Sequence, residues 1–149
     1  MTSADLKPSA TWQQLAPAIG RKFRAGEPFE DILEMNVAIK QRDLRPYEAH
    51  RARLDELLWH DDPKPKRIIE IGAGYGAMAT FWPEGSTVVN IDLPEMLEVQ
   101  AHYLQRVGVT NVELVPYTEA DGVDFKGAYV FSVWALTETN PETWRYYAS

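Results

Sequence analysis

Residues 67–79 read Arg67-Ile68-Ile69-Glu70-Ile71-Gly72-Ala73-Gly74-Tyr75-Gly76-Ala77-Met78-Ala79. The β-branched run before the first glycine is typical of a strand that is covered on both faces. The three glycines allow positive φ and let the backbone approach a ligand closely. A helix-compatible pattern resumes after them, and we expect a helix at about 75–81. A buried strand, a glycine turn and a helix N-terminus together predict a nucleotide-binding corner.

The glycines alone leave the nucleotide open. A G-x-G-x-x-G/A pattern runs through Gly72, Gly74 and Ala77, whereas a G-x-G-x-G pattern ends at Gly76. Glu70 adds information, because a carboxylate near the end of an apolar strand is costly unless it has a polar partner. An ammonium or sulfonium ligand would suit Glu70, and a pyrophosphate would be repelled by it. The alternative is that Glu70 caps nearby backbone or pairs with Arg or Lys.

A second acidic residue closes the next predicted strand, at 87–91. Asp92 follows Gly72 by about 20 residues, which is the separation expected of a carboxylate that binds ribose hydroxyls. The alternative role is an N-cap for the helix that is expected to begin near Pro94. The two roles compete for the same carboxylate oxygens.

These residues carry a resemblance to a known family. The run from Glu70 to Gly76, followed by Asp92, resembles motifs I and II of class I S-adenosylmethionine-dependent methyltransferases. The run Asp92-Leu93-Pro94-Glu95-Met96-Leu97, with Gln100 and Tyr103-Leu104 after it, is similar to a bacterial group of sugar O-methyltransferases. The segment 131–138 resembles the part of that group that follows strand four. The resemblance covers roughly residues 67–138.

The resemblance implies S-adenosylmethionine as cofactor and methyl transfer to a hydroxyl of a small-molecule acceptor such as a sugar. It assigns to cofactor binding the residues Glu70, Gly72, Ala73, Gly74, Tyr75, Gly76, Asp92, Leu93 and Glu119. Leu93 would pack on the adenine, and Glu119 or Asp121 would meet its amino group; solvated loop charges are the alternative for those two acids. Glu138 would be the general base, because a sugar hydroxyl has a pKa far above 7. A charge at the entry of the last helix is its alternative role.

Composition excludes several other classes of function. The net charge of −7 argues against a nucleic-acid substrate held on a broad basic face. Because the chain has no Cys, it can form neither a disulfide nor a thiolate zinc site, and with only 3 His we expect no metal site. No apolar run has the length of a membrane span, and residues 1–10 lack the apolar core of a signal peptide. We therefore expect a cytoplasmic protein without membrane or nucleic-acid partners.

The order of predicted elements divides the chain into an N-terminal helical segment, 1–62, and an α/β cofactor-binding domain, 63–149. Helices are expected at 11–23, where Pro17 should kink or shorten the helix, and at 29–41 and 46–59. Further strands are expected at 111–115 and 128–134. The helix at 94–107 should turn Leu97, Ala101 and Leu104 inward and stop at Gly108, and Asn140 should cap a last helix. This alternation predicts a Rossmann-like parallel sheet with helices on both faces.

The family resemblance implies a seven-stranded sheet in the order 3-2-1-4-5-7-6, but the sequence provides about four strands, in the order 3-2-1-4. We therefore expect a C-terminally truncated domain whose strand-four edge could pair with a second copy of the chain, since a bare apolar edge promotes association. Two other functions stay open. One is a non-catalytic, methyltransferase-like cofactor-binding or interaction module. The other is an NAD-binding domain.

Overall fold

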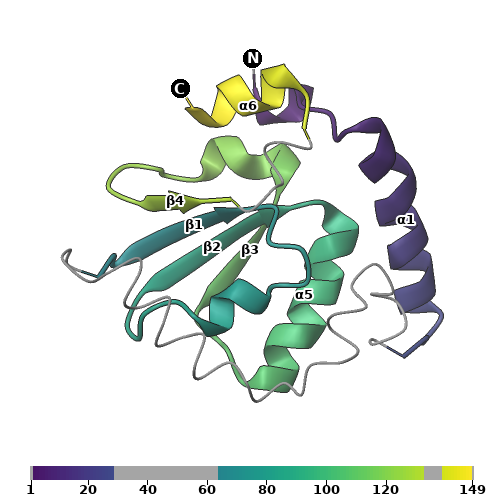
Figure 1. Cartoon of the computed structure of the whole chain (residues 1–149), viewed down its shortest axis with the longest axis horizontal. Helices are drawn as coiled ribbons and strands as arrows, with labels where there is room; N and C mark the ends of the chain where they lie inside the picture. Colours follow the sequence, from purple (N-terminus) through teal and green to yellow (C-terminus); the bar gives the residue numbers. More distant parts are fainter. Residues whose placement is uncertain (1, 29–63, 133–138, 149) are drawn as a thin grey trace.

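The structure is a computed structural model that describes residues 2–28, 64–132 and 139–148 (Figure 1). Its centre is a parallel sheet whose strands stand in the order β3-β2-β1-β4. The strand bounds are β1 Arg67–Ile71, β2 Thr87–Asp92, β3 Val112–Pro116 and β4 Tyr129–Phe131. The predicted α/β, Rossmann-like fold and its strand order are thereby confirmed. The predicted bounds of the first two strands agree within one residue.

Strand alternation divides the core into two faces. Ile68 and Val88 share one face with α5 (Pro94–Val107), and Ile19 of α1 (Ala10–Arg24) joins the same core. Figure 1 shows α5 between the sheet and α1. Ile69 and Val89 point to the other face, where Tyr147 of α6 (Pro141–Ala148) packs. Both faces are therefore covered, as the continuous apolar strands require.

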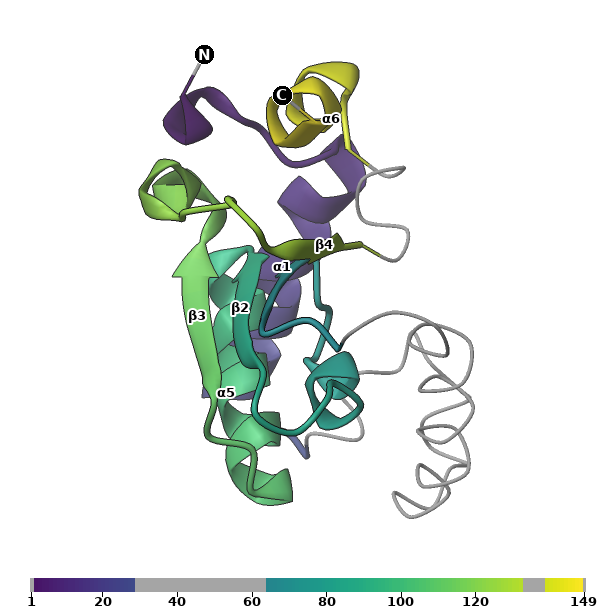
Figure 2. The ribbon, with the colours of Figure 1, turned by 90° about the vertical axis from the view of Figure 1, so that its left-hand side faces the viewer.

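The two ends of the described chain meet beyond the carboxyl ends of the strands. Figure 2 shows α6 and the N-terminal 3₁₀ helix η1 (Ser3–Asp5) together at that end of the sheet. Both contact η3 (Tyr117–Gly122), the 3₁₀ helix that follows β3. Asp121 of η3 accepts a hydrogen bond from Ser3 N at 2.9 Å and another from the hydroxyl of Tyr146. The N-terminal turn is thus attached to the element that follows β3.

Two helix predictions need correction. Pro17 does not end the first helix, which continues to Arg24 because Ala16 and Ile19 are buried in the core and offset the lost backbone hydrogen bond. Ala101 of α5 is exposed, whereas Leu97 and Leu104 are buried as predicted. The buried face is centred on Val99, Gln100 and Tyr103 and so leaves Ala101 at its margin. Gly108 ends α5 as predicted, with φ 74°.

The segment after the glycines also differs from the prediction. Instead of an α-helix at 75–81, it holds the short 3₁₀ helix η2 (Ala77–Thr80). Gly76 has φ 89°, a left-handed conformation that interrupts any helix begun before it, and Pro83 follows too soon for several α-helical turns. The glycine corner therefore opens onto a single tight turn.

Several predictions fall outside the described residues. They are the helices at 29–41 and 46–59, the domain boundary after residue 62, the end of strand four and Glu138. In the described sheet β4 is an outer strand, and its Val130 is 43% exposed. Pairing of that edge with a second copy stays a prediction. None of the helices in the described part of the chain combines the length and apolarity that crossing a membrane requires.

Candidate functional site at the glycine corner

The glycine loop has the backbone conformation that its sequence predicts. Gly72, Gly74 and Gly76 have φ values of 73°, 61° and 89°, a region that other residues rarely adopt. The N–H of Gly72 donates to the carbonyl of Ile91 at 2.8 Å, which joins the loop to the end of β2. A Cβ atom at Gly74 would meet nothing within 4 Å. The loop thus presents bare backbone to open space at the carboxyl edge of β1.

Asp92 is bound to this loop. Its Oδ2 accepts hydrogen bonds from Gly74 N at 3.1 Å and from Gln100 Nε2 at 2.8 Å. Its Oδ1 accepts from Leu93 N at 2.8 Å. The N-cap position of α5 is held by Leu93, with no side-chain capping bond, so the alternative role of Asp92 as N-cap is wrong. Asp92 instead braces the glycine loop while its side chain stays partly accessible to solvent.

A line of buried polar side chains continues from Asp92 beneath the loop. Gln100 Nε2 also donates to the carbonyl of Gly74 at 3.0 Å, and Gln100 Oε1 accepts from Asn90 Nδ2 at 3.1 Å. Asn90 is the strand partner of Glu70 in the parallel pairing of β1 and β2. Since side chains two residues apart share a face, Glu70, Asn90 and Asp92 all lie on the α5 face of the sheet. Glu70 is 2% exposed, and Asn90 and Gln100 are 0% exposed.

Burial changes the acidity of both carboxyl groups. Burial raises the pKa of Glu70 to about 7; the nearby Trp82 indole lowers that pKa in part, and the Asp92 charge raises it further. Burial likewise raises the pKa of Asp92 to about 7, against the hydrogen bonds from Leu93, Gly74, Gln100 and Ala73. Because like charges repel, the pair accepts its first proton more readily than its second. We assign the first proton to Glu70. Several hydrogen-bond donors stabilise the charged form of Asp92, whereas Glu70 Oε2 has no hydrogen bond of ordinary geometry within the described residues.

The other predicted site residues differ in their burial and in their contacts. Ala73 lies buried in the loop, and Tyr75 packs edge-on against Tyr103 of α5, with ring centroids 5.0 Å apart. Leu93 is partly buried against the core beside Asp92. Glu119 is exposed on η3, the turn that follows β3. Asp121, the other candidate for the adenine, is already hydrogen-bonded to both ends of the chain.

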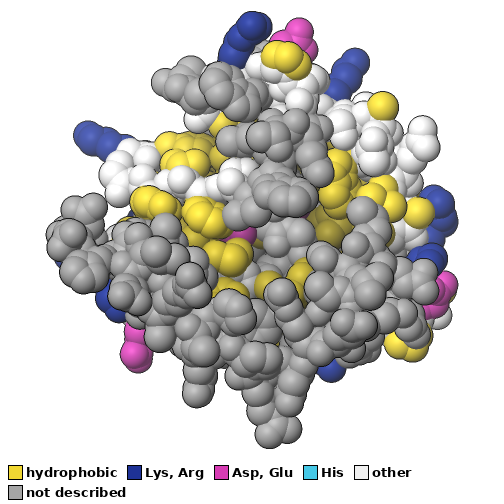
Figure 3. Space-filling view, in the orientation of Figure 1, with side chains coloured by type: hydrophobic (Ala, Val, Ile, Leu, Met, Phe, Trp, Pro, Cys, Tyr) yellow, Lys and Arg dark blue, Asp and Glu magenta, His cyan; other side chains and the backbone are white. Residues whose placement is uncertain are grey.

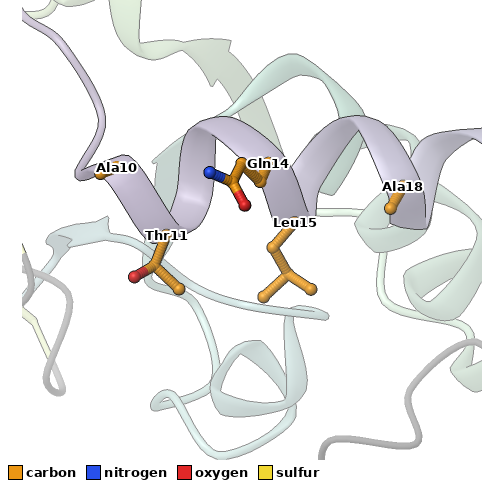
Figure 4. Close-up of a pocket in the computed structure, with 5 residues that line it drawn as sticks. All are labelled: Ala10, Thr11, Gln14, Leu15 and Ala18. Carbon is orange, nitrogen blue, oxygen red and sulfur yellow. The ribbon is translucent and has the colours of Figure 1, made fainter.

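The surface over the corner combines acidic and apolar groups. In the view of Figure 3, an acidic patch is visible among hydrophobic side chains over the carboxyl ends of the central strands. A separate shallow recess lies along α1, where Ala10, Thr11, Gln14, Leu15 and Ala18 line it (Figure 4). Its described lining contains no titratable side chain and no residue of the glycine loop. We therefore place the candidate site at the corner and not on α1.

Sequence reasoning did not assign a function to Asn90 or Gln100. The available signal was polarity: Asn90 interrupts the apolar run of β2, and Gln100 lies on the apolar stripe of α5. A buried amide is costly unless its donors and acceptor are satisfied, so such a residue marks a specific hydrogen-bonding task. Identification of the partners required the strand register and the helix rotation.

Comparison with known proteins gives partial likenesses. No family model matches the chain, and no curated protein matches it. Among solved structures, a protein-L-isoaspartate O-methyltransferase is 26% identical over 57% of this chain and 28% of its own, with a TM-score of 0.41. A SAM-dependent methyltransferase from Aquifex aeolicus is 18% identical over 69% of this chain and 63% of its own, with a TM-score of 0.45. An SAH-bound Podospora anserina methyltransferase, PaMTH1, is 21% identical over 69% and 41%, with a TM-score of 0.37.

The chain thus spans less than two thirds of the length of each of these structures. The TM-scores lie below 0.5, and we base the functional proposal on the geometry of the corner.

Proposed function

We propose that the glycine corner binds S-adenosylmethionine and that the protein is a methyltransferase acting on a hydroxyl group, with a sugar as the acceptor class. The observation that carries the proposal is a pair of carboxyl groups, the buried Glu70 and the partly accessible Asp92, at a glycine loop that leads into a 3₁₀ turn. This arrangement favours a nucleoside with a diol and positive charge over a nucleotide with phosphates.

The electrostatics of the corner disfavour a dinucleotide. A pyrophosphate is bound where backbone N–H groups and the positive end of an α-helix dipole point at it. Here residues 72–86 are all described, and the glycines are followed by η2, four residues of 3₁₀ helix, whose dipole is small. The carboxylate of Asp92 stands close by. S-adenosylmethionine carries a sulfonium, an ammonium and a ribose diol and has no phosphate, so the same carboxylate favours it.

The corner has room and unused acceptors for such a ligand. A Cβ atom at Gly74 would meet nothing within 4 Å, so the backbone of Gly74 can lie against the amino-acid part of the cofactor. Asp92 Oδ1 accepts a hydrogen bond from Leu93 N, and a carboxylate oxygen has capacity for a second donor such as a ribose hydroxyl. Glu70 lies buried beneath the loop and would act on the cofactor through the loop. Leu93 and Glu119 would serve the adenine.

The chemistry of transfer requires few groups. The bound sulfonium supplies an electrophilic methyl group, and the protein has to align the acceptor oxygen with it. Glu138 would accept the hydroxyl proton of a sugar, because that group is un-ionised at neutral pH. Its position lies outside the described residues. If the acceptor side is incomplete, the chain is the non-catalytic cofactor-binding module.

Calorimetric titration with S-adenosylmethionine, S-adenosylhomocysteine and NAD tests the proposal. We expect saturable binding of the first two, and a loss of at least about tenfold in affinity in Asp92→Asn, since one charge-assisted hydrogen bond contributes about 1.5–3 kcal/mol. Glu113→Gln, an equal change of charge on the exposed side of β3, should bind as the wild type does. Binding of NAD without S-adenosylhomocysteine would instead identify a dinucleotide domain.

A second assay separates an enzyme from a module. Transfer of a labelled methyl group from S-adenosylmethionine to a panel of sugars should be lost in Glu138→Gln. Glu142→Gln is the control, because Glu142 is an exposed acid in the first turn of α6. Cofactor binding without transfer to any acceptor would favour the module.

A further inference from the structure

Two buried oxygen atoms beneath the glycine loop have no hydrogen-bond donor of ordinary geometry among the described residues. They are Oε2 of Glu70 and Oδ1 of Asn90. The two residues are direct partners in the pairing of β1 with β2, on the same face, and neighbouring strands lie about 4.8 Å apart. Both side chains are almost completely buried, where an unsatisfied acceptor is costly. A single proton between them would satisfy both.

The other hydrogen bonds fix the direction in which that proton must be donated. Gln100 Nε2 faces two acceptors, Gly74 O and Asp92 Oδ2, so its amide nitrogen must point toward the loop and its oxygen toward β2. Asn90 must then turn its nitrogen to Gln100 Oε1, as the structure shows. Asn90 Oδ1 is therefore the acceptor that remains at the β1 end of the line.

We propose that Glu70 holds a proton and donates it to Asn90 Oδ1, so that Glu70, Asn90 and Gln100 act as positioning residues in a one-directional hydrogen-bond chain that ends on Asp92 and Gly74. The proton comes from solvent, and no covalent bond other than the carboxyl O–H is made. This hydrogen-bond chain orients the Asp92 carboxylate and the Gly74 peptide at the corner. Its existence is independent of the ligand, whereas its effect on affinity rests on the proposed function.

Ionisation of Glu70 would reverse the direction of donation along this hydrogen-bond chain. Besides the Trp82 indole N–H, a carboxylate at position 70 needs a second donor for Oε2, and the amide of Asn90 would turn its nitrogen toward that oxygen. Gln100 would then have to present its nitrogen to Asn90 and its oxygen to Asp92, which places two acceptors against each other and removes the donor from Gly74 O. Among the groups that face Glu70, Asp92 is charged and Trp82 carries an N–H, while the strand partner on β4, Phe131, is uncharged. Burial raises the pKa of Glu70 to about 7, which is consistent with a proton held near neutral pH.

The first experiment needs no ligand. Infrared difference spectra of the full chain at about one pH unit below 7 should show a protonated-carboxyl band that Glu70→Gln lacks and that Glu113→Gln retains. The side-chain amide signals of Asn90 and Gln100 in NMR spectra should move together as that band disappears with rising pH. A spectrum in which Glu70→Gln loses no such band, or amide signals that do not move with it, would overturn the proposal and indicate an ionised Glu70 served by a buried water.

The second experiment measures the coupling to the corner. The affinity for S-adenosylhomocysteine in the wild type should fall about tenfold per unit rise in pH between the pKa of Glu70 in the free protein and the higher pKa that this group has in the complex. In Glu70→Gln the fall should be absent, because an amide nitrogen donates to Asn90 Oδ1 at every pH. An unchanged pH profile in Glu70→Gln would refute the coupling. Absence of binding at any pH, with the infrared band present, would refute the proposed function and leave the hydrogen-bond chain intact.

Discussion

Replacement of Gln100 by Leu is the sharpest test of the polar line under the loop. The side chain is 0% exposed and makes hydrogen bonds with Asn90, Asp92 and Gly74. A buried Asn90 amide without its acceptor costs about 1–3 kcal/mol, and each of the other two bonds contributes about 1 kcal/mol. Burial of the Leu side chain returns about 2 kcal/mol. We expect a net loss of about 2 kcal/mol in the free energy of unfolding.

Urea unfolding followed by tryptophan fluorescence measures this loss, and Gln105→Leu is the matched control. Gln105 lies on the same helix with an exposed side chain, so the identical change there should alter stability by less than about 0.5 kcal/mol. In thermal unfolding the Gln100 variant should melt about 4–8 °C lower than the control. Equal stability of the two variants would refute the reasoning, because it would mean that the buried amide contributes nothing beyond its volume.

Three further predictions concern the glycine loop, Glu70 and the attachment of the N-terminus. Gly74→Ala and Gly108→Ala both place a methyl group at a left-handed residue with open space around it, so each should lose about 1–2 kcal/mol of stability, but only Gly74→Ala should weaken cofactor binding in calorimetry. Burial raises the pKa of Glu70 from 4.5 to about 7, and the folded state therefore binds a proton that the unfolded state releases. Glu70 should contribute a fall of up to about 3 kcal/mol in the free energy of unfolding as the pH rises through that window, and urea titrations of Glu70→Gln should show a fall smaller by this amount, because Asp92, whose pKa burial also raises to about 7, still titrates there. Asp121→Ala removes the acceptor of Ser3 N, so amide hydrogen exchange at Ser3 should accelerate, and an unchanged rate would contradict the attachment described for the N-terminus.

The elements that the sequence predicted well are those set by neighbouring residues. The apolar run before Gly72 defines β1, and Gly108 ends α5 in the left-handed conformation that glycine adopts without strain. Asn140 precedes the last helix and accepts a hydrogen bond from Thr143 N at 2.9 Å, as an N-cap does. Each of these features depends on residues a few positions apart, and the pattern alone therefore identifies them.

The features that the sequence did not predict depend on residues brought together by the fold. Gln100 meets Gly74, 26 positions earlier in the chain, only because α5 packs on the sheet with a particular rotation. The same rotation exposes Ala101, which a count of helical spacing had placed inward. From its local effect, Pro17 was expected to kink or shorten its helix. Burial of that helix against α5 keeps the helix at full length. Tertiary packing determines whether such residues are buried and whether such a helix continues, and the periodicity of the sequence does not reveal it.

The hydrogen bonds of Asp92 explain how one carboxylate can brace the loop and also receive a ligand. Each carboxylate oxygen accepts about two hydrogen bonds. Oδ2 is filled by Gly74 N and Gln100 Nε2, whereas Oδ1 accepts from Leu93 N. A ribose diol would therefore find one open position at Oδ1, and its second hydroxyl would have to compete with a donor of the loop. Because the proposed hydrogen-bond chain from Glu70 sets the strength of that donor, the buried Glu70 carboxyl group influences the partly accessible Asp92 carboxylate without touching the ligand.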